Sequence, residues 1–353
     1  MGKLAVYKYF SFMFLVVTVL VSAFTGFALF GGTSNPATGT AMAMLVYMLP
    51  FLIAGNLILI VYWAVRRRWH WLCIPVVTTL CCIPFIGTLY QVRIFTHPDE
   101  NKSGFKIASY NVALFGREIS GFKAEDILSE MKKQKADILC MQEFLEFSGD
   151  KNNFKKYKEF FTFAAKGRDD MVIFSRYPIN NSELIDFGKH TNNSAMWADI
   201  DVNGTVIRVF NVHLETTGFN RTLHKFAKLE QQGANLESNA FLSAIYGNYT
   251  VGMIIRARQA NLVAQLIKES PYPVIVCGDF NDVPYSYVYY TMLGNLVDGF
   301  KECGNGFMYT FRGGRYVRID YIFHDETLTG ENYYKQELSY SDHYPVFMRF
   351  SLN

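Results

Sequence analysis

Three long apolar stretches without a charged residue dominate the first quarter of this 353-residue chain and restrict how it can fold. They cover about residues 10–30, 41–65 and 71–90. A helix needs roughly 20 apolar residues to cross the hydrocarbon core of a bilayer, and each stretch reaches that length. A cleaved signal peptide or a re-entrant segment could account for the first stretch, but not for the other two. We therefore predict three transmembrane helices in a membrane anchor of residues 1–95.

The positive charges around these stretches predict their orientation. Lys3 and Lys8 precede the first stretch, and Arg66, Arg67 and Arg68 separate the second from the third. The loop between the first two stretches carries no charge. Because positively charged loops tend to stay in the cytoplasm, the N-terminus and the arginine loop are expected there. Three crossings then place the rest of the chain, after a linker at residues 96–104, on the extracytoplasmic side of a plasma or inner membrane.

Residues 105–353 alternate strand-like apolar runs with helical patterns, which predicts an α/β fold. Strands are expected at residues 106–112, 136–142, 171–175, 206–212, 274–277, 318–323 and 346–350, and helices at 124–135 and 256–269. The segment of residues 215–255 is too long to be an ordinary loop. We expect this segment to be partly helical and to cover the functional site or touch the bilayer.

Polar side chains recur at the ends of the predicted strands. They are Asn111, Glu143, His213, Asp279, Asn281, Asp320, Asp342 and His343. A carboxylate within a buried strand is costly unless it is paired, hydrogen-bonded or bound to a metal. Carboxylate and amide oxygens favour Mg²⁺ or a similar hard cation, whereas zinc would need more His or Cys ligands. The chain has no Gly-rich phosphate loop, which argues against P-loop nucleotide hydrolysis.

The motifs around these residues, taken in order, resemble those of the endonuclease/exonuclease/phosphatase superfamily. They read Ser-Tyr-Asn, Met-Gln-Glu, Ser-Arg-Tyr-Pro-Ile, Asn-Val-His-Leu, Gly-Asp-Phe-Asn-Asp, Arg-Ile-Asp-Tyr-Ile-Phe and Ser-Asp-His-Tyr-Pro-Val. Each motif is weak alone, but seven in this order are specific. The resemblance covers roughly residues 105–352. It implies a deoxyribonuclease I-like four-layer α/β sandwich and a phosphoesterase that depends on Mg²⁺, or on Mn²⁺ in its place.

The resemblance also implies three metal ligands. Glu143 would be the principal ligand, and Asn111 and Asp342 would contribute oxygens to the same ion or to a second one. Outside this set of motifs, Asn111 and Asp342 would be interpreted as turn or capping residues and Glu143 as a solvated strand end.

Five further residues would act in catalysis by the same resemblance. Asp279 would orient or deprotonate the attacking water, and Asn281 would hold that water or a phosphate oxygen. His213, which alone would be interpreted as a core histidine, would hydrogen-bond the scissile phosphate. His343, held by Asp320, would stabilise the transition state or transfer a proton. The Asp–His pair also has a physical reason that is independent of the resemblance, because a carboxylate fixes the imidazole tautomer and raises the imidazole pKa.

Other polar residues are given structural roles. Asp298 and Thr310 match family positions but are expected to pack or to form turns. Asp169 and Asp170 have no assigned role and are expected in a surface turn.

The catalytic set does not select a substrate, because one fold serves many chemistries. A lipid or other extracytoplasmic phosphodiester is slightly favoured, since tethering raises the local concentration of lipid headgroups. A net charge of +3 argues against a strongly basic nucleic-acid binder, although a membrane-anchored nuclease is the nearest alternative. A non-catalytic receptor on the same scaffold, or a membrane scaffold, represents a different class. The expected partners are the bilayer and a phosphoester with a lipid headgroup or nucleic acid, and the sequence indicates no protein partner.

Overall fold

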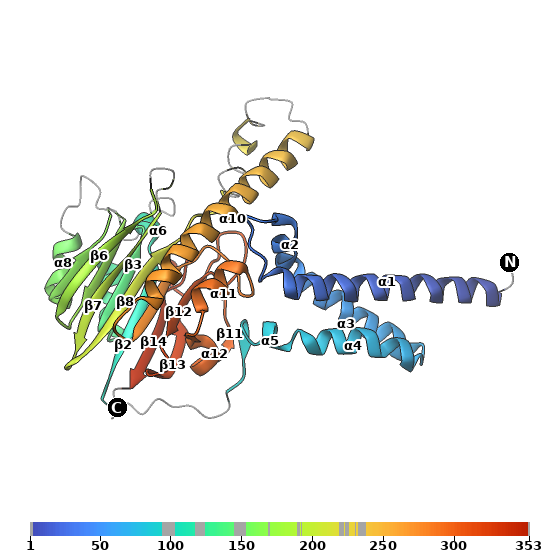
Figure 1. The fold of residues 1–353 in the computed structure, drawn as a ribbon, viewed down its shortest axis with the longest axis horizontal. Helices are drawn as coiled ribbons and strands as arrows, with labels where there is room; N and C mark the ends of the chain where they lie inside the picture. The colour runs from blue at the N-terminus through green and yellow to red at the C-terminus, as the bar shows by residue number, and fades with distance from the viewer. Residues whose placement is uncertain are drawn as a thin grey trace. The chain divides into compact units, whose positions relative to one another are not determined.

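A computed structural model describes residues 3–93, 103–116, 124–144, 153–168, 170–188, 191, 193–218, 222, 226–229, 231 and 238–351 (Figure 1). The chain divides into two compact units. The first consists of Met1–Gly87 with Tyr285–Tyr290, and the second of Thr88–Pro284 with Thr291–Asn353.

Apolar helices make up most of the first unit. They are α1 (Lys3–Gly31), α2 (Thr40–Met44), η1 (Leu45–Met48), α3 (Leu49–Val65), α4 (Trp69–Cys81) and α5 (Ile83–Ile86). Three helical segments are long and apolar enough to cross a membrane, namely Tyr7–Gly31, Thr40–Val65 and Trp69–Ile86. They agree with the three predicted stretches in number and approximate position.

Helices α1 and α3 are joined by hydrogen bonds between polar side chains. The buried Asn56 amide donates to Thr25 Oγ1 at 2.8 Å, and Ser22 Oγ donates to Asn56 Oδ1 at 3.1 Å. The Trp63 indole donates to Thr18 Oγ1 at 2.9 Å. These contacts satisfy the few polar groups of otherwise apolar helices, as interhelical side-chain bonds do in membrane bundles.

The third apolar stretch ends earlier than predicted. We expected a helix to residue 90, but α5 ends at Ile86, and Tyr90 belongs to strand β1 (Tyr90–Gln91), which pairs with β11 (Gly306–Phe307). The carbonyl of Thr88 accepts a hydrogen bond from the buried Arg318 guanidinium at 2.9 Å. Hydropathy does not predict these backbone hydrogen bonds, which hold residues 88–91 within the second unit. Residues 94–102, which include most of the expected linker, lie outside the described residues.

Two six-stranded mixed sheets form the second unit (Figure 1). One has the order β13-β14-β2-β3-β5-β4, with bounds Thr329–Lys335, Val346–Ser351, Gly104–Asn111, Ile138–Gln142, Met171–Ser175 and Phe163–Lys166. The other has the order β10-β12-β9-β8-β7-β6, with bounds Val297–Asp298, Asp320–His324, Val274–Asp279, Thr205–His213, Ser194–Val202 and Ile179–Asp186. The pairs β2–β3 and β8–β9 are parallel.

Side-chain alternation along the strands separates two apolar layers. Ile107 of β2 packs with residues of both sheets, such as Ile207 of β8, in the core between them. Its neighbour Ala108 points to the other face of its sheet, where α7 (Ala124–Lys133) and α8 (Asn153–Phe161) contribute Ile127 and Tyr157. A period of two residues is what places successive side chains on opposite faces. The predicted α/β sandwich with apolar N-terminal helices is thus confirmed.

Helix α10 (Ser238–Lys268) includes the helix predicted at residues 256–269 but begins 18 residues earlier. Its later part buries Ala257, Ala260 and Val263, and Arg256 Nε donates to Asp282 Oδ2 at 3.2 Å. The earlier part carries no charged residue and therefore lacks the polar face that makes an amphipathic helix recognisable. Shorter helices are α6 (Ala113–Gly116), α11 (Tyr287–Leu293) and α12 (Gly299–Cys303).

Candidate active site

Strand pairing brings the polar strand ends to one edge of the two sheets. In the first sheet Asn111, the last residue of β2, pairs with Gln142, which immediately precedes Glu143. In the second sheet the pairs are His213 with Asp279 and Asp279 with Asp320. The parallel and antiparallel registers therefore place chemically active side chains from distant parts of the sequence side by side.

Asn111 links the two sheets at this edge. Its amide Nδ2 lies 3.1 Å from both Glu143 Oε1 and Asp279 Oδ2, and its Oδ1 accepts from the Ala113 backbone N–H at 3.0 Å. Asn111 and Asp279 are almost fully buried, whereas about a third of the Glu143 side chain is exposed. One carboxylate thus faces solvent while a second lies behind it.

His343 forms a buried pair with Asp320. Its Nδ1 lies 3.0 Å from Asp320 Oδ2, and its Nε2 lies 3.6 Å from Asp279 Oδ2. Burial alone lowers the pKa of His343, but the carboxylates of Asp320 and Asp279 outweigh it and raise the pKa to about 10. The imidazole is therefore protonated at neutral pH in the metal-free protein.

His213 lies among three carboxylates. Its Nε2 is 3.8 Å from Glu143 Oε1 and 3.9 Å from Asp279 Oδ2, and its Nδ1 is 3.9 Å from Asp170 Oδ2. Burial alone lowers the pKa of His213, but Asp170, Asp279 and Glu143 raise it above its ordinary value. Asp170 lies in a turn, as expected, but its side chain is mostly buried and lies beside His213. The sequence signal for Asp170 was the acidic pair Asp169–Asp170, to which no role was assigned. Asp169 lies outside the described residues.

Asn281 is held against Asp279 by the turn after β9. Its backbone N–H donates to Asp279 Oδ1 at 2.8 Å, and its amide donates to the Leu214 carbonyl at 2.9 Å. Gly278 precedes this turn with φ +138°, and a Cβ there would lie 1.9 Å from the Val212 carbonyl oxygen. The motif thus needs glycine at this position, because the backbones of β8 and β9 approach each other closely.

The closing triplet Ser341-Asp342-His343 is fixed by backbone contacts. Ser341 Oγ donates to the Asn111 carbonyl at 2.8 Å and accepts from the His343 N–H at 3.1 Å. Asp342 is partly exposed, and its carbonyl accepts from the Arg312 N–H at 2.9 Å. Within the described ranges, no hydrogen bond or ion pair joins the Asp342 carboxylate to Asn111 or Glu143. The structure brings Asn111 and Glu143 together directly, while the Asp342 carboxylate accepts from Ser341 Oγ at 3.4 Å and helps to raise the pKa of His343.

Thr310 has a supporting contact that sequence reasoning did not assign. Its Oγ1 accepts from the backbone N–H groups of Asp320 and Ile319 at 3.0 and 3.1 Å. It therefore fixes the start of β12, where Asp320 meets His343. A lone threonine carries no sequence signal for such a role.

A divalent cation fits the chemistry of this site. By distance alone Asp279, Asp320 and His343 could hold an ion, since one ligand atom of each lies within 4.8 Å of the others, but Asp320 already occupies His343 Nδ1. Burial raises the pKa of Asp279 and nearby Asp320 raises it further, while His343 lowers it. Clustered buried carboxylates repel one another unless a positive charge lies nearby, and their oxygens are the ligands that hard cations prefer. Glu143 adds a further carboxylate at the same edge, held by a hydrogen bond from Asn111 Nδ2.

Comparisons with known proteins show the family to which the chain belongs. The model of the endonuclease/exonuclease/phosphatase family matches residues 108–343, about two thirds of the chain. A domain of unknown function matches residues 11–89. The comparison with curated proteins found no match.

Solved structures share the fold of the second unit. An endonuclease/exonuclease/phosphatase from Bacteroides vulgatus is 19% identical, with a TM-score of 0.52, over 71% of this chain and 100% of that one. TDP2 from D. rerio, complexed with a single-strand DNA product, is 18% identical with a TM-score of 0.51, over 71% and 100%. A mannosyl-6-phosphatase from Bacteroides thetaiotaomicron is 19% identical with a TM-score of 0.50, over 70% and 100%.

At these identities the solved structures show the fold alone, while the family match covers most of the second unit and all eight predicted site residues. The chain therefore belongs to the endonuclease/exonuclease/phosphatase family and is a divalent-metal-dependent phosphoester hydrolase.

Proposed function

We propose that this protein is a membrane-tethered phosphodiesterase that acts outside the cytoplasm. The observation that carries the proposal is the cluster of Asn111, Glu143, Asp279, His213 and His343 at one edge of the sheets. Their closest contacts are 3.1 to 3.9 Å long. Such a group of carboxylates, amide and imidazoles suits hydrolysis of a phosphoester with a bound cation.

Glu143 and Asn111 would hold the cation, with Asp342 as a third ligand, and Mg²⁺ or Mn²⁺ is the ion we propose. When bound, the ion supplies positive charge that neutralises phosphate oxygens. His343 is a poor ligand in the arrangement seen here, because Asp320 occupies its Nδ1 and the raised pKa keeps it protonated. We therefore assign the Asp320–His343 pair to charge stabilisation or proton transfer rather than to metal binding.

The remaining residues would act on the water and the phosphate. Asp279, oriented by Asn281, would position or deprotonate the attacking water. His213 and His343 carry raised pKa values and would donate hydrogen bonds to the phosphate as its charge develops. Buried positive groups act strongly there because the site is shielded from water.

The domain organisation we propose is a membrane anchor of residues 1–95, a linker of 96–104 and a catalytic domain of 105–353. Three apolar helical segments support the anchor. The positive charges near them support a cytoplasmic N-terminus and an extracytoplasmic catalytic domain. A plasma or inner membrane is the location that fits this orientation.

A lipid or other extracytoplasmic phosphodiester is the substrate class we favour. Besides tethering, support comes from the charge-free first part of α10, where Tyr246 and Val251 are more than half exposed. Exposed apolar side chains of this kind suit a lipid surface better than a phosphate backbone. Nucleic acid is the second candidate, because D. rerio TDP2 of the same fold was solved with a single-strand DNA product.

The test uses the full chain purified in detergent micelles. Metal-dependent release of p-nitrophenolate from bis-p-nitrophenyl phosphate, abolished by EDTA, is the expected result. A panel of plasmid DNA, RNA, sphingomyelin, phosphatidylinositol phosphates and inositol phosphates would then rank the substrates. Absence of metal-dependent turnover throughout would refute the hydrolase and favour a non-catalytic receptor. An inactive C-terminal alkaline phosphatase fusion in a bacterial host would overturn the proposed orientation.

A further inference from the structure

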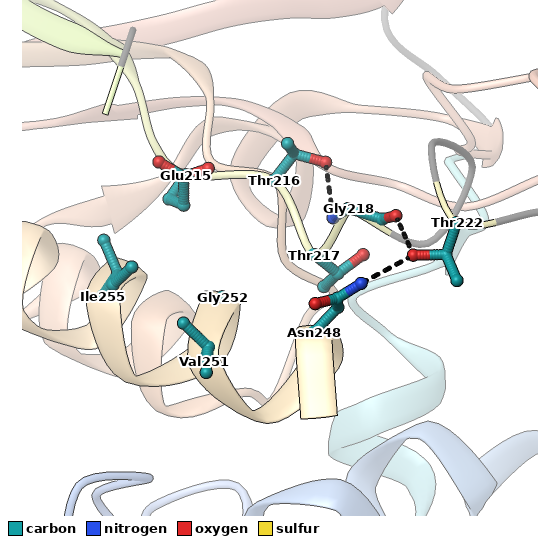
Figure 2. A pocket seen from close by; sticks show the side chains of 9 residues that line it. All are labelled: Glu215, Thr216, Thr217, Gly218, Thr222, Asn248, Val251, Gly252 and Ile255. Atoms are coloured by element: carbon teal, nitrogen blue, oxygen red, sulfur yellow. Dashed lines mark hydrogen bonds between the residues drawn. The ribbon is translucent and has the colours of Figure 1, made fainter. Parts of the chain in front are cut away.

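A cavity that begins two residues after His213 has no role in the chemistry described above. It measures about 380 Å³ and lies between the segment after β8 and the first part of α10 (Figure 2). Residues 215–218 and Thr222 form one wall, and Asn248, Val251, Gly252 and Ile255 form the other. This volume lies at the small end of ligand sites and suits a compact group.

One hydrogen bond between the walls and one within a wall hold the cavity in shape. Asn248 Nδ2 donates to Thr222 Oγ1 at 2.8 Å, and Thr222 Oγ1 donates to the Gly218 carbonyl at 3.0 Å, as Figure 2 shows. At Gly252 a Cβ would come within 2.8 Å of the Thr216 carbonyl oxygen, so a glycine permits the helix to approach this wall closely. The cavity is therefore a built site rather than a gap between loops.

The cavity is joined to the catalytic edge through Glu215. This residue stands two positions after His213, and the intervening Leu214 carbonyl accepts the Asn281 amide at 2.9 Å. Arg256 Nη1 donates to the Glu215 carbonyl at 2.8 Å. A group that occupies the cavity would thus lie near the strand end that carries His213 and the turn that carries Asn281.

The lining indicates which chemistry the cavity accepts. The hydroxyls of Thr216 and Thr217, the Asn248 amide oxygen and the Glu215 carboxylate, which also accepts from Thr191 Oγ1, supply polar atoms, while Val251 and Ile255 supply apolar surface. Among the described lining residues Glu215 is the only charged one, and none is Lys, Arg or His. A second phosphate would meet no positive charge here and would be repelled by Glu215. An uncharged alcohol with several hydroxyl groups finds both donors and acceptors.

We propose that this cavity binds the hydroxyl-bearing alcohol portion of the phosphodiester substrate and selects against a second phosphate. The proposal rests on the proposed phosphodiesterase and adds the substrate class that its site accepts. The same alcohol chemistry could come from a lipid headgroup or from a water-soluble diester.

The experiment compares p-nitrophenyl diesters that differ only in the second alcohol, with the full chain in detergent micelles and Mg²⁺. The alcohols are methanol, glycerol and 3-phosphoglycerol. We expect kcat/KM for the glyceryl ester to exceed that for the methyl ester by at least about tenfold, because a site built for hydroxyls discriminates strongly against their absence. The phosphoglyceryl ester should be cleaved more slowly than the glyceryl ester. Micellar phosphatidylglycerol and soluble glycerophosphoglycerol then separate a lipid source from a soluble one.

Two matched variants test the cavity itself. Val251→Trp projects an indole from the α10 wall, and Leu262→Trp makes the same change eleven residues, or about three helical turns, further along the exposed helix surface. Val251→Trp should lower the glyceryl-to-methyl ratio of kcat/KM about tenfold, and Leu262→Trp should leave that ratio as in the wild type. Glu215→Gln should raise relative turnover of the phosphoglyceryl ester.

Each remaining outcome has a defined meaning. Equal kcat/KM for the methyl and glyceryl esters in the wild type overturns the cavity assignment while the phosphodiesterase stands. An equal effect of the two tryptophan variants on the ratio overturns it as well. Absence of turnover for all three esters refutes the phosphodiesterase and the cavity assignment together.

Discussion

His343 Nδ1 lies 3.0 Å from Asp320 Oδ2, and both residues are at least 95% buried. The two residues are 23 positions apart and meet because β12 starts at Asp320 while the turn before β14 ends at His343. A buried carboxylate beside an imidazole stabilises the imidazolium, so this contact sets the charge of the site.

Asp320→Asn should lower the pKa of His343 well below its value of about 10, because the largest carboxylate contribution is removed. The shift is measurable by NMR titration of the histidine ring protons in the metal-free protein. A raised folded-state pKa stabilises the fold fully below the ordinary histidine pKa of about 6.5 and loses that contribution as pH rises through about 10. Loss of stability of the wild type, relative to Asp320→Asn, should therefore develop across this window. An unchanged His343 titration would contradict the assigned pairing.

Glu143→Ala and His343→Ala should each lower kcat on bis-p-nitrophenyl phosphate by about 10²–10⁴-fold, the range typical for loss of a positioned acid–base or electrostatic group. Circular dichroism should show the fold retained. Glu183→Ala serves as the matched control, because Glu183 lies exposed on β6 away from the cluster. Wild-type rates in either site variant would refute its assigned role.

Mg²⁺ or Mn²⁺ should raise the melting temperature of the second unit, because a ligand that binds only the folded state stabilises it by about 2.7 kcal/mol at one hundred times its Kd. Glu143→Gln should remove most of this shift, since it replaces a carboxylate ligand with an amide of equal size. Glu183→Gln should keep it. A metal-induced shift of equal size in both variants would place the ion elsewhere.

Asp298→Ala should destabilise the second unit by about 3–5 kcal/mol, the usual cost of leaving one partner of a buried ion pair alone. Asp298 contacts the fully buried Arg318 at 2.5 and 2.9 Å and caps α12 by accepting from the Phe300 N–H at 3.1 Å. Urea unfolding in detergent measures the change in the free energy of unfolding.

Arg168→Ala is the control for this prediction. It removes a solvent-exposed ion pair with Asp186 and should change the free energy of unfolding by no more than about 1 kcal/mol. Comparable losses in Asp298→Ala and Arg168→Ala would show that burial of the pair does not matter.

Local patterns predicted much of the secondary structure. The strand expected at residues 171–175 matches β5, and the helix expected at 124–135 matches α7, because strong periodicity reflects burial on one face. The edge strand β6 was not predicted, since most of its side chains are polar and exposed. Helix α10 was predicted only in its later part, from Arg256 onward, where charged residues distinguish a polar face from the apolar one.

Hydropathy, periodicity and motif order predicted the apolar N-terminal helices, the α/β class and the polar residues at strand ends, because each of these is a local property. The partners of those polar residues depend on how the chain folds. Strand register places Asn111 between Glu143 and Asp279, and folding brings Asp170 beside His213. Among the described residues, no hydrogen bond or ion pair joins the Asp342 carboxylate to Asn111 or Glu143. The tertiary structure also ends the third apolar segment at Ile86 and forms a cavity between Glu215 and α10. Such relationships depend on backbone bonds and packing between distant segments, which no local pattern records.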